Sequence, residues 1–218
     1  MLTIFGRRSS SNVQKVMWLV GELKLPHRLV PLGGDHGGLD DPAFTALNPN
    51  GRIPTIKEGD VVVWESHAIL RYLAANYGGE IFWRENAAER SLSDRWMDWA
   101  QTVWQPSFVD GVFWGWYRTP EAQRNERVVA EAIRASAQLM QLLDRVLAER
   151  SFLAGDTLTL ADIAVGATLF RYFNLDIERP RVANVEAWRA RLEARPAYRE
   201  HVMIPFEELK DKPFPAGR

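Results

Sequence analysis

The stretch NPNGRIPTI, residues 48–56, constrains the fold more than any other part of the sequence. Its Asn-Pro and Asn-Gly pairs are typical of turns. Pro54 stands where a strand begins, because a proline lacks the N–H that the interior of a sheet requires. If the Ile53–Pro54 bond is cis, Ile53 can turn its own N–H and C=O outward to pair with an extended peptide. The stretch therefore predicts a sheet edge that receives a short peptide.

Strand and helix signals alternate on both sides of this stretch. Val13, Val16, Met17, Val20 and Leu23 have the spacing of an amphipathic helix, and Glu58-Gly59-Asp60 has the composition of a hairpin turn. The order strand–helix–strand followed by hairpin and helix predicts a small mixed sheet with helices against its faces. We expect strands at Leu2–Phe5, His27–Pro31, Pro54–Lys57 and Val61–Trp64, and helices at Val13–Leu23 and Ser66–Tyr77.

From about Ala87 to Met203 the sequence has helix signals and no convincing strand. Thr119-Pro120-Glu121 predicts the start of a helix that runs to Leu147. Thr159 and Asp162 have the spacing of a capping box, so we expect both to serve folding. The arginines near the chain end, Arg195 among them, are expected on a solvated face. The predicted domains are a mixed α/β domain at residues 1–78, a linker at 79–86 and an all-helical domain with a C-terminal tail at 87–218.

Composition excludes several classes of function. The 218 residues include no cysteine, so a disulfide framework, a thiolate zinc site and a thiol nucleophile of the protein's own are excluded. The four histidines lack metal-ligand spacing, so we expect no metal. Twenty-seven Lys and Arg against 28 Asp and Glu argue against nucleic-acid binding. Short apolar runs and an N-terminus unlike a signal peptide predict a cytoplasmic protein that does not bind membranes.

Two further features suggest a ligand site. Ser9-Ser10-Ser11-Asn12 lies where the first helix begins, and these residues either cap the helix or stabilise an anion such as a thiolate. Any such thiolate arrives with a ligand, since the protein has none. Glu65-Ser66 opens the next long helix, where Ser66 can donate to a carboxylate and Glu65 can accept from an ammonium group. Together with the peptide-binding edge, these features suit a short thiol peptide.

Four stretches carry a resemblance to the glutathione S-transferase family. They are SSSNVQKV at residues 9–16, NPNGRIPTI at 48–56, WESHAILRYL at 64–73 and GDTLTLADIAVG at 155–166. The chain resembles the bacterial, serine-type, theta-like or related members along nearly its whole length. This resemblance implies a thioredoxin-like N-terminal domain (βαβ–ββα) that binds glutathione and a helical-bundle C-terminal domain that shapes the electrophile pocket. It also implies a homodimer that works in detoxification.

The same resemblance assigns roles to individual residues. Ser10 stands where theta-like members keep the serine that hydrogen-bonds the glutathione sulfur, with Ser9 and Ser11 as open alternatives. Asn12 matches an asparagine that some bacterial relatives use in that role. Glutathione itself is expected to contact Ile53 with a cis Pro54, Glu65, Ser66 and Arg52.

Five of the nine tryptophans lie between Trp96 and Trp116. They either form the core between helices or line a pocket for flat apolar ligands, and for Phe113, Trp114 and Tyr117 both interpretations stay open. The predicted function is a glutathione transferase that joins the thiolate of its co-substrate glutathione to a small hydrophobic electrophile. The alternatives are a glutathione-dependent isomerase or peroxidase on the same fold, or a non-catalytic protein that binds hydrophobic ligands.

Overall fold

The computed structural model describes residues 1–213 and divides the chain into two compact units. The first unit contains Met1–Arg90 and Ala194–Ile204, and the second contains Ser91–Glu193 and the chain from Pro205 on. Residues 214–218, the end of the expected C-terminal tail, lie outside the described residues.

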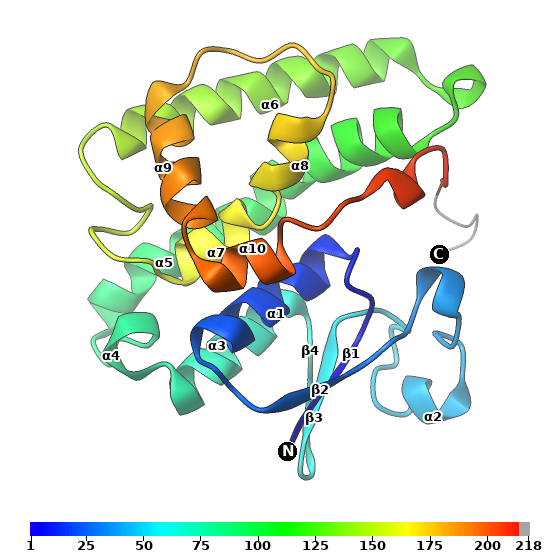
Figure 1. Cartoon of the computed structure of the whole chain (residues 1–218), viewed down its shortest axis with the longest axis vertical. Coiled ribbons are helices and arrows are strands. Elements are labelled where there is room, and N and C mark those ends of the chain that lie inside the picture. The colour runs from blue at the N-terminus through cyan, green and yellow to red at the C-terminus, as the bar shows by residue number, and fades with distance from the viewer. Residues whose placement is uncertain (214–218) are drawn as a thin grey trace. The chain divides into compact units, whose positions relative to one another are not determined.

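The first unit is built on a four-stranded mixed sheet in the order β2-β1-β3-β4 (Figure 1). β1 (Leu2–Phe5) pairs in parallel with β2 (His27–Val30) and antiparallel with β3 (Thr55–Glu58). β3 and β4 (Val61–Trp64) form the expected antiparallel hairpin. This arrangement confirms the thioredoxin-like fold.

Two helices of equal length accompany the sheet. α1 (Ser11–Glu22) and α3 (Ser66–Tyr77) pack against each other. α1 buries its apolar side chains from Val13 to Val20, and α3 buries Ile69, Leu70, Leu73 and Ala74. The short α2 (Pro42–Thr45) and the single 3₁₀ turn η1 (Gly34–His36) lie away from these two helices (Figure 1). Within residues 79–86, the expected linker, the chain forms the short helix α4 (Gly79–Phe82).

A helix from near the chain end completes the first unit. α10 (Pro196–His201) packs against α1, where the Tyr198 ring meets the Trp18 ring edge-on at 4.7 Å between centroids. Arg195 was expected on a solvated face; its side chain is 35% exposed, and it also forms an ion pair that the sequence did not reveal. Its guanidinium holds both carboxylate oxygens of Glu22 because α10 brings it to the end of α1.

The second unit is helical, and its longest elements lie side by side. α5 (Ala87–Trp99) leads into a wider π-helical segment, η2 (Ala100–Arg118), and α6 (Glu126–Leu147) packs along it (Figure 1). The remaining helical elements are η3 (Glu121–Gln123), α7 (Leu160–Gly166), α8 (Leu169–Asn174), α9 (Ala183–Glu193) and η4 (Glu207–Leu209).

The predicted start of the long helix at Thr119-Pro120-Glu121 is wrong. The Thr119 hydroxyl donates to the Trp114 carbonyl at 2.8 Å, so it belongs to the end of η2, and Pro120 is extended with ψ 142°. α6 begins instead after Asn125, whose side chain accepts from the Val128 N–H.

The predicted capping box at the start of α7 is confirmed. One oxygen of Asp162 accepts from the Thr159 N–H and hydroxyl, and the other accepts from the Leu153 N–H and the Trp188 indole. The carboxyl is fully buried, and burial raises its pKa to about 6 although the four donors oppose this. Asp162 therefore ties a helix start, a loop and α9 together.

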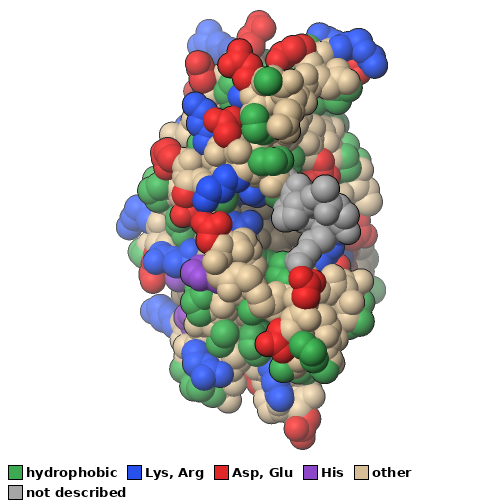
Figure 2. Space-filling model, turned by 90° about the vertical axis from the view of Figure 1, so that its right-hand side faces the viewer, with side chains coloured by type: hydrophobic (Ala, Val, Ile, Leu, Met, Phe, Trp, Pro, Cys, Tyr) green, Lys and Arg blue, Asp and Glu red, His purple; other side chains and the backbone are tan. Residues whose placement is uncertain are grey.

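The surface carries charges of both signs. Figure 2 shows Lys and Arg side chains intermixed with Asp and Glu over one face. Along residues 1–213, no helix is both long and apolar enough to cross a membrane. Over the same residues, His, Asp and Glu side chains form no group of three or more that could hold a metal ion.

Candidate functional site

Three predicted features of the first unit meet at one end of its sheet. Phe5 pairs with Thr55 across β1 and β3, and Thr55 pairs with Trp64 across β3 and β4. The turn after Phe5, the residues just before Thr55 and the residue after Trp64 therefore leave the sheet at the same end. This register brings the Ser9–Asn12 turn, Ile53-Pro54 and Glu65-Ser66 together, which the sequence alone did not determine.

The turn between β1 and α1 separates the three serines. The Arg7 guanidinium donates to the Ser9 hydroxyl at 2.7 Å, and Ser9 is buried. Ser10 is half-buried and occupies the N-cap position, yet its side chain accepts from none of the first amides of α1. Its backbone is held instead, by its own N–H to the Arg7 carbonyl and by the Gln14 N–H to its carbonyl. Ser10 therefore has the cap position without the cap bond, which leaves its hydroxyl for another partner.

Asn12 lies in the first turn of the same helix. It is half-buried, and its side-chain carbonyl oxygen is buried without a hydrogen-bond partner. A buried polar atom without a partner is unfavourable and is typical of a site that a ligand or water completes.

Asn48 holds the loop that precedes β3. The Asn48 amide donates to the Arg52 carbonyl at 2.8 Å and to the Thr55 hydroxyl at 3.0 Å. The Ile53–Pro54 peptide bond is cis. Ile53 is half-buried, Pro54 is buried and the Arg52 side chain is exposed. The loop is thus fixed in place at the start of β3.

The glycine-rich loop at residues 33–38 packs against this end of the sheet. A Cβ on Gly33 would stand 3.2 Å from Ile53 Cδ1, and a Cβ on Gly34 would stand 2.9 Å from Arg7 Cδ. Both glycines have positive φ, which L side chains rarely adopt. His36 is exposed. The glycines therefore let the loop approach both Arg7 and Ile53.

Glu65 and Ser66 form the N-terminus of α3. Glu65 is the N-cap residue, with an exposed side chain and the unusual backbone φ of 70°. Ser66 is buried, and its backbone N–H belongs to the first turn of the helix. First-turn N–H groups and the helix dipole favour an anion at this position.

One residue of this region was missed by the sequence analysis. Lys15 of α1 is 2% exposed, and its Nζ lies 3.2 Å from Nε2 of His67 in α3. Burial lowers the pKa of Lys15 from 10.5 to about 8, while the charge of Glu65 opposes this. The only signal in the sequence was a lysine directly before the apolar run Val16–Val20 of this helix.

The aromatic residues predicted for a pocket lie in the second unit. The Phe113 and Tyr117 rings stack at 5.4 Å, and Phe206 meets both edge-on. Trp114 instead lies under the Arg118 guanidinium, 3.7 Å from its ring centre. Phe113 is buried and Tyr117 is half-buried, so Tyr117 is the more accessible member of the pair.

Burial and the charges of Glu207 and Asp211 raise the pKa of Tyr117. Its phenol is therefore protonated at neutral pH, and its hydroxyl donates to the Phe206 carbonyl at 3.5 Å. The structure thus brings Phe113 and Tyr117 together and places Trp114 in a different contact.

Comparison with known proteins gives consistent matches over both units. A model of the glutathione S-transferase N-terminal domain matches residues 9–76, and one of the C-terminal domain matches residues 105–196. Glutathione S-transferase GstB of Escherichia coli is 36% identical over 207 residues, which are 94% of this chain and 99% of GstB. Glutathione S-transferase 3 of Zea mays is 31% identical over 92% of this chain and 93% of its own length. The solved theta class glutathione S-transferase of Xanthomonas axonopodis pv. citri, with glutathione bound, matches at a TM-score of 0.88 and 44% identity over 94% of this chain and 98% of that chain.

Proposed function

Since this chain belongs to the glutathione S-transferase family, we propose that it joins the glutathione thiolate to a small hydrophobic electrophile, with Ser10 stabilising the thiolate. The observation that carries the proposal is the meeting of the Ser9–Asn12 turn, Ile53-Pro54 and Glu65-Ser66 at one end of the sheet. A tripeptide that binds along this end can contact Glu65-Ser66 with its first residue, Ile53 with its cysteine backbone and the Ser9–Asn12 turn with its cysteine sulfur.

The first unit binds the tripeptide through backbone hydrogen bonds and through charged side chains. Ile53 pairs its N–H and C=O with the cysteinyl unit, as an added strand does at a sheet edge. Glu65 accepts from the γ-glutamyl ammonium, while Ser66 donates to the γ-glutamyl carboxylate at the start of α3. The exposed Arg52 approaches the glycine carboxylate.

Ser10 acts as a hydrogen-bond donor and not as a nucleophile. A free thiol with a pKa of about 8.5 is only a few per cent thiolate at neutral pH. Lowering that pKa by two units requires roughly 2.7 kcal/mol of preference for the thiolate. One hydroxyl donor contributes about 1.5–3 kcal/mol to a charged partner, and the N-terminus of α1 adds up to about 1 kcal/mol. These contributions suffice without a general base, and the Asn12 amide can share the role of donor.

The electrophile is the partner of the second unit's aromatic residues. The half-buried Tyr117 and Trp114 can contact a flat apolar group, while the buried Phe113 supports the Tyr117 ring from behind. The Tyr117 phenol keeps its proton at neutral pH and can donate to an oxygen of the electrophile in place of the Phe206 carbonyl. This assignment gives glutathione and the electrophile different residues, so their affinities can be changed separately.

The ionisation of bound glutathione tests the proposal. The thiolate absorbance of the complex is titrated with pH in the unchanged protein and in Ser10→Ala, with Ser9→Ala, Ser11→Ala and Asn12→Ala beside it. We expect Ser10→Ala to raise the midpoint by about one to two pH units, since it removes a donor to the charged form. The exposed Ser91 supplies the control, Ser91→Ala. An unchanged midpoint in Ser10→Ala, with a shift in one of its neighbours, would assign the role to that neighbour instead.

A panel of electrophiles, peroxides and isomerisable acids, assayed with glutathione, tests the reaction itself. Consumption of the thiol with electrophiles supports conjugation. Turnover only of peroxides or of isomerisable acids would contradict it and replace it with the peroxidase or the isomerase reaction. Binding of glutathione and hydrophobic ligands without any turnover would instead mean a binding protein.

The assembly and setting of the enzyme belong to the same proposal. We expect a homodimer, with a mass in solution near twice the 24.9 kDa of the chain, as light scattering would measure. A detoxifying role in the cytoplasm stays a prediction, to be checked by cell fractionation and by the sensitivity of a deletion strain to electrophiles.

A further inference from the structure

The buried lysine of α1 has an unusual partner. Lys15 is 2% exposed, and its Nζ contacts the Nε2 of His67 at 3.2 Å, an imidazole and not a carboxylate. Burying a charged ammonium is costly unless something nearby compensates for it. A methionine or leucine would fill the same space at no such cost, so the amine calls for an explanation beyond packing.

The contact with His67 survives a change in the protonation of Lys15. An ammonium donates to Nε2 when the imidazole carries its proton on Nδ1, and a neutral amine accepts from Nε2 when the imidazole carries its proton there. The pair therefore keeps its geometry while its charge changes. Since the pKa of Lys15 is lowered to about 8, this change falls near the working pH of an enzyme.

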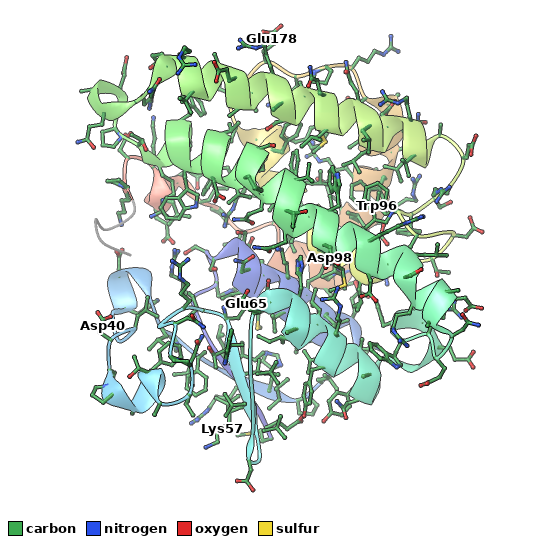
Figure 3. The ribbon with its side chains drawn as sticks, turned by 180° about the vertical axis from the view of Figure 1, so that it is seen from behind. Asp40, Lys57, Glu65, Trp96, Asp98 and Glu178 are labelled. Carbon is green, nitrogen blue, oxygen red and sulfur yellow. The ribbon has the colours of Figure 1, made fainter. Side chains whose placement is uncertain are left out.

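Lys15 and His67 lie next to the N-terminus of α3. His67 follows Ser66 in the first turn of that helix, and Glu65 precedes Ser66. Figure 3 shows Glu65 where the ribbon of α3 begins. The charge of Glu65 acts on Lys15, so the amine and the predicted glutamyl site are electrostatically linked.

We propose that Lys15 is a positioning residue for the γ-glutamyl end of glutathione: through His67 it holds the start of α3, and its buried positive charge favours the glutamyl carboxylate at Ser66. The inference rests on the proposed function. The positive charge of Lys15 adds to the first-turn N–H groups and to the Ser66 hydroxyl, which favour a carboxylate, while the negative Glu65 favours an ammonium group. Lys15, Ser66 and Glu65 together therefore match a ligand group that carries one ammonium and one carboxylate.

The titratable and charged groups near α1 come from the two helices that pack against it, α3 and α10. α1 packs against α3, which contributes Glu65, His67 and, one turn later, Arg71. It also packs against α10, whose Arg195 and His201 meet Glu22 and Gly21 at the far end of α1. Burial lowers the pKa of His201 below its ordinary value of 6.5, so its titration lies at lower pH than that of Lys15.

The decisive measurement is binding of two S-methylated tripeptides by calorimetry between pH 6 and 10. The first, glutaryl-Cys-Gly, keeps the glutamyl carboxylate and lacks the ammonium. The second, 4-aminobutyryl-Cys-Gly, keeps the ammonium and lacks the carboxylate. The glutaryl peptide has no titrating group in this range, so an inflection in its dissociation constant reports the protein.

We expect the dissociation constant of the glutaryl peptide to rise about fivefold with an inflection near or above pH 8, as the charge of Lys15 is lost. Lys15→Met should bind this peptide about fivefold more weakly at pH 7, without the inflection. Lys57→Met is the matched control, because Lys57 is exposed and lies on β3 toward the hairpin turn, away from Glu65 (Figure 3). Circular dichroism shows whether the variants are folded.

The outcomes separate this inference from the proposed function. Failure of the unchanged protein to bind S-methylglutathione at any pH would overturn the proposed function and the inference together. Binding of the glutaryl peptide that is flat with pH in the unchanged protein would overturn the inference alone, and this result needs no variant. An inflection of the same size in Lys15→Met would also overturn it.

Discussion

Arg195 of α10 contacts both carboxylate oxygens of Glu22 on α1, at 2.7 and 2.6 Å, although the two residues lie 173 positions apart. The indole N–H of Trp18 donates to the same carboxylate at 2.9 Å. A paired, partly buried geometry of this kind contributes more than an exposed ion pair, because both donors of the arginine are aligned. The chain end is therefore tied to the first unit.

We expect Arg195→Ala to lower the free energy of unfolding by about 1–2 kcal/mol. Glu22→Ala should cost more, about 2–3 kcal/mol, because it also leaves the buried Trp18 indole without its acceptor. Urea denaturation measures both, and the double variant gives their coupling. Arg127→Ala is the comparison, since its pair with Glu131 is exposed and should change stability by about 0.5 kcal/mol at most. An equal effect of Arg195→Ala and Arg127→Ala would contradict the argument.

Asp162→Asn tests the capping box of α7. Both oxygens of Asp162 accept two hydrogen bonds each, and an asparagine would turn an NH₂ group toward two of these donors. We expect a loss of about 2–3 kcal/mol of stability, read from the denaturation midpoint. Asp156→Asn makes the same chemical change at an exposed position and should be neutral. Unchanged stability in Asp162→Asn would mean that the loop and α9 do not depend on this carboxylate.

Asp162 and Arg195 show which contacts of the fold can be predicted from sequence and which cannot. The capping box was predictable because Thr159 and Asp162 are three positions apart and make their contacts locally. The contact of Arg195 with Glu22 was not, since nothing near Arg195 in sequence marks its partner. The start of α6 was misplaced for a related reason: Thr119 has the character of a cap, but its hydroxyl is already bonded to Trp114.

In the candidate site, too, the residues in local motifs were predicted and those defined by packing between helices were not. Ile53-Pro54 and Glu65-Ser66 were predicted because each lies in a local motif, and the pairing register brings them together. Lys15 was not predicted, because a helical pattern shows which positions are apolar but not that a polar residue among them is buried. Its partner His67 comes from another helix, so only the packing of α1 on α3 shows the pair.

Tyr117→Phe tests the assignment of the electrophile to the second unit. Removing the hydroxyl keeps the stacking on Phe113 but loses the donor. For an electrophile with a carbonyl or nitro oxygen, we expect kcat/KM to fall about three- to tenfold while the KM for glutathione is unchanged. Because burial raises the pKa of Tyr117, the unchanged protein should show no loss of activity from this phenol up to pH 9. An equal loss with an electrophile that lacks an oxygen acceptor would argue for a packing role instead.

The glycine-rich loop offers a pair of matched substitutions. Gly34 and Gly37 both have positive φ, 61° and 62°, so alanine strains the backbone at both positions. A Cβ at Gly34 would meet Arg7 Cδ and Nε at 2.9 Å, whereas one at Gly37 would meet nothing within 4 Å. Only the Gly34 variant therefore disturbs Arg7, which donates to the Ser9 hydroxyl beside Ser10.

We expect each alanine to lower stability by about 1 kcal/mol through backbone strain. Only Gly34→Ala should also change the site: displacement of Arg7 should raise the KM for glutathione about threefold and leave the KM for the electrophile as it was. Steady-state kinetics at varied glutathione, beside a denaturation curve for each variant, gives both quantities. If Gly37→Ala raised the KM for glutathione as much as Gly34→Ala, the loop would act through its own conformation and not through Arg7.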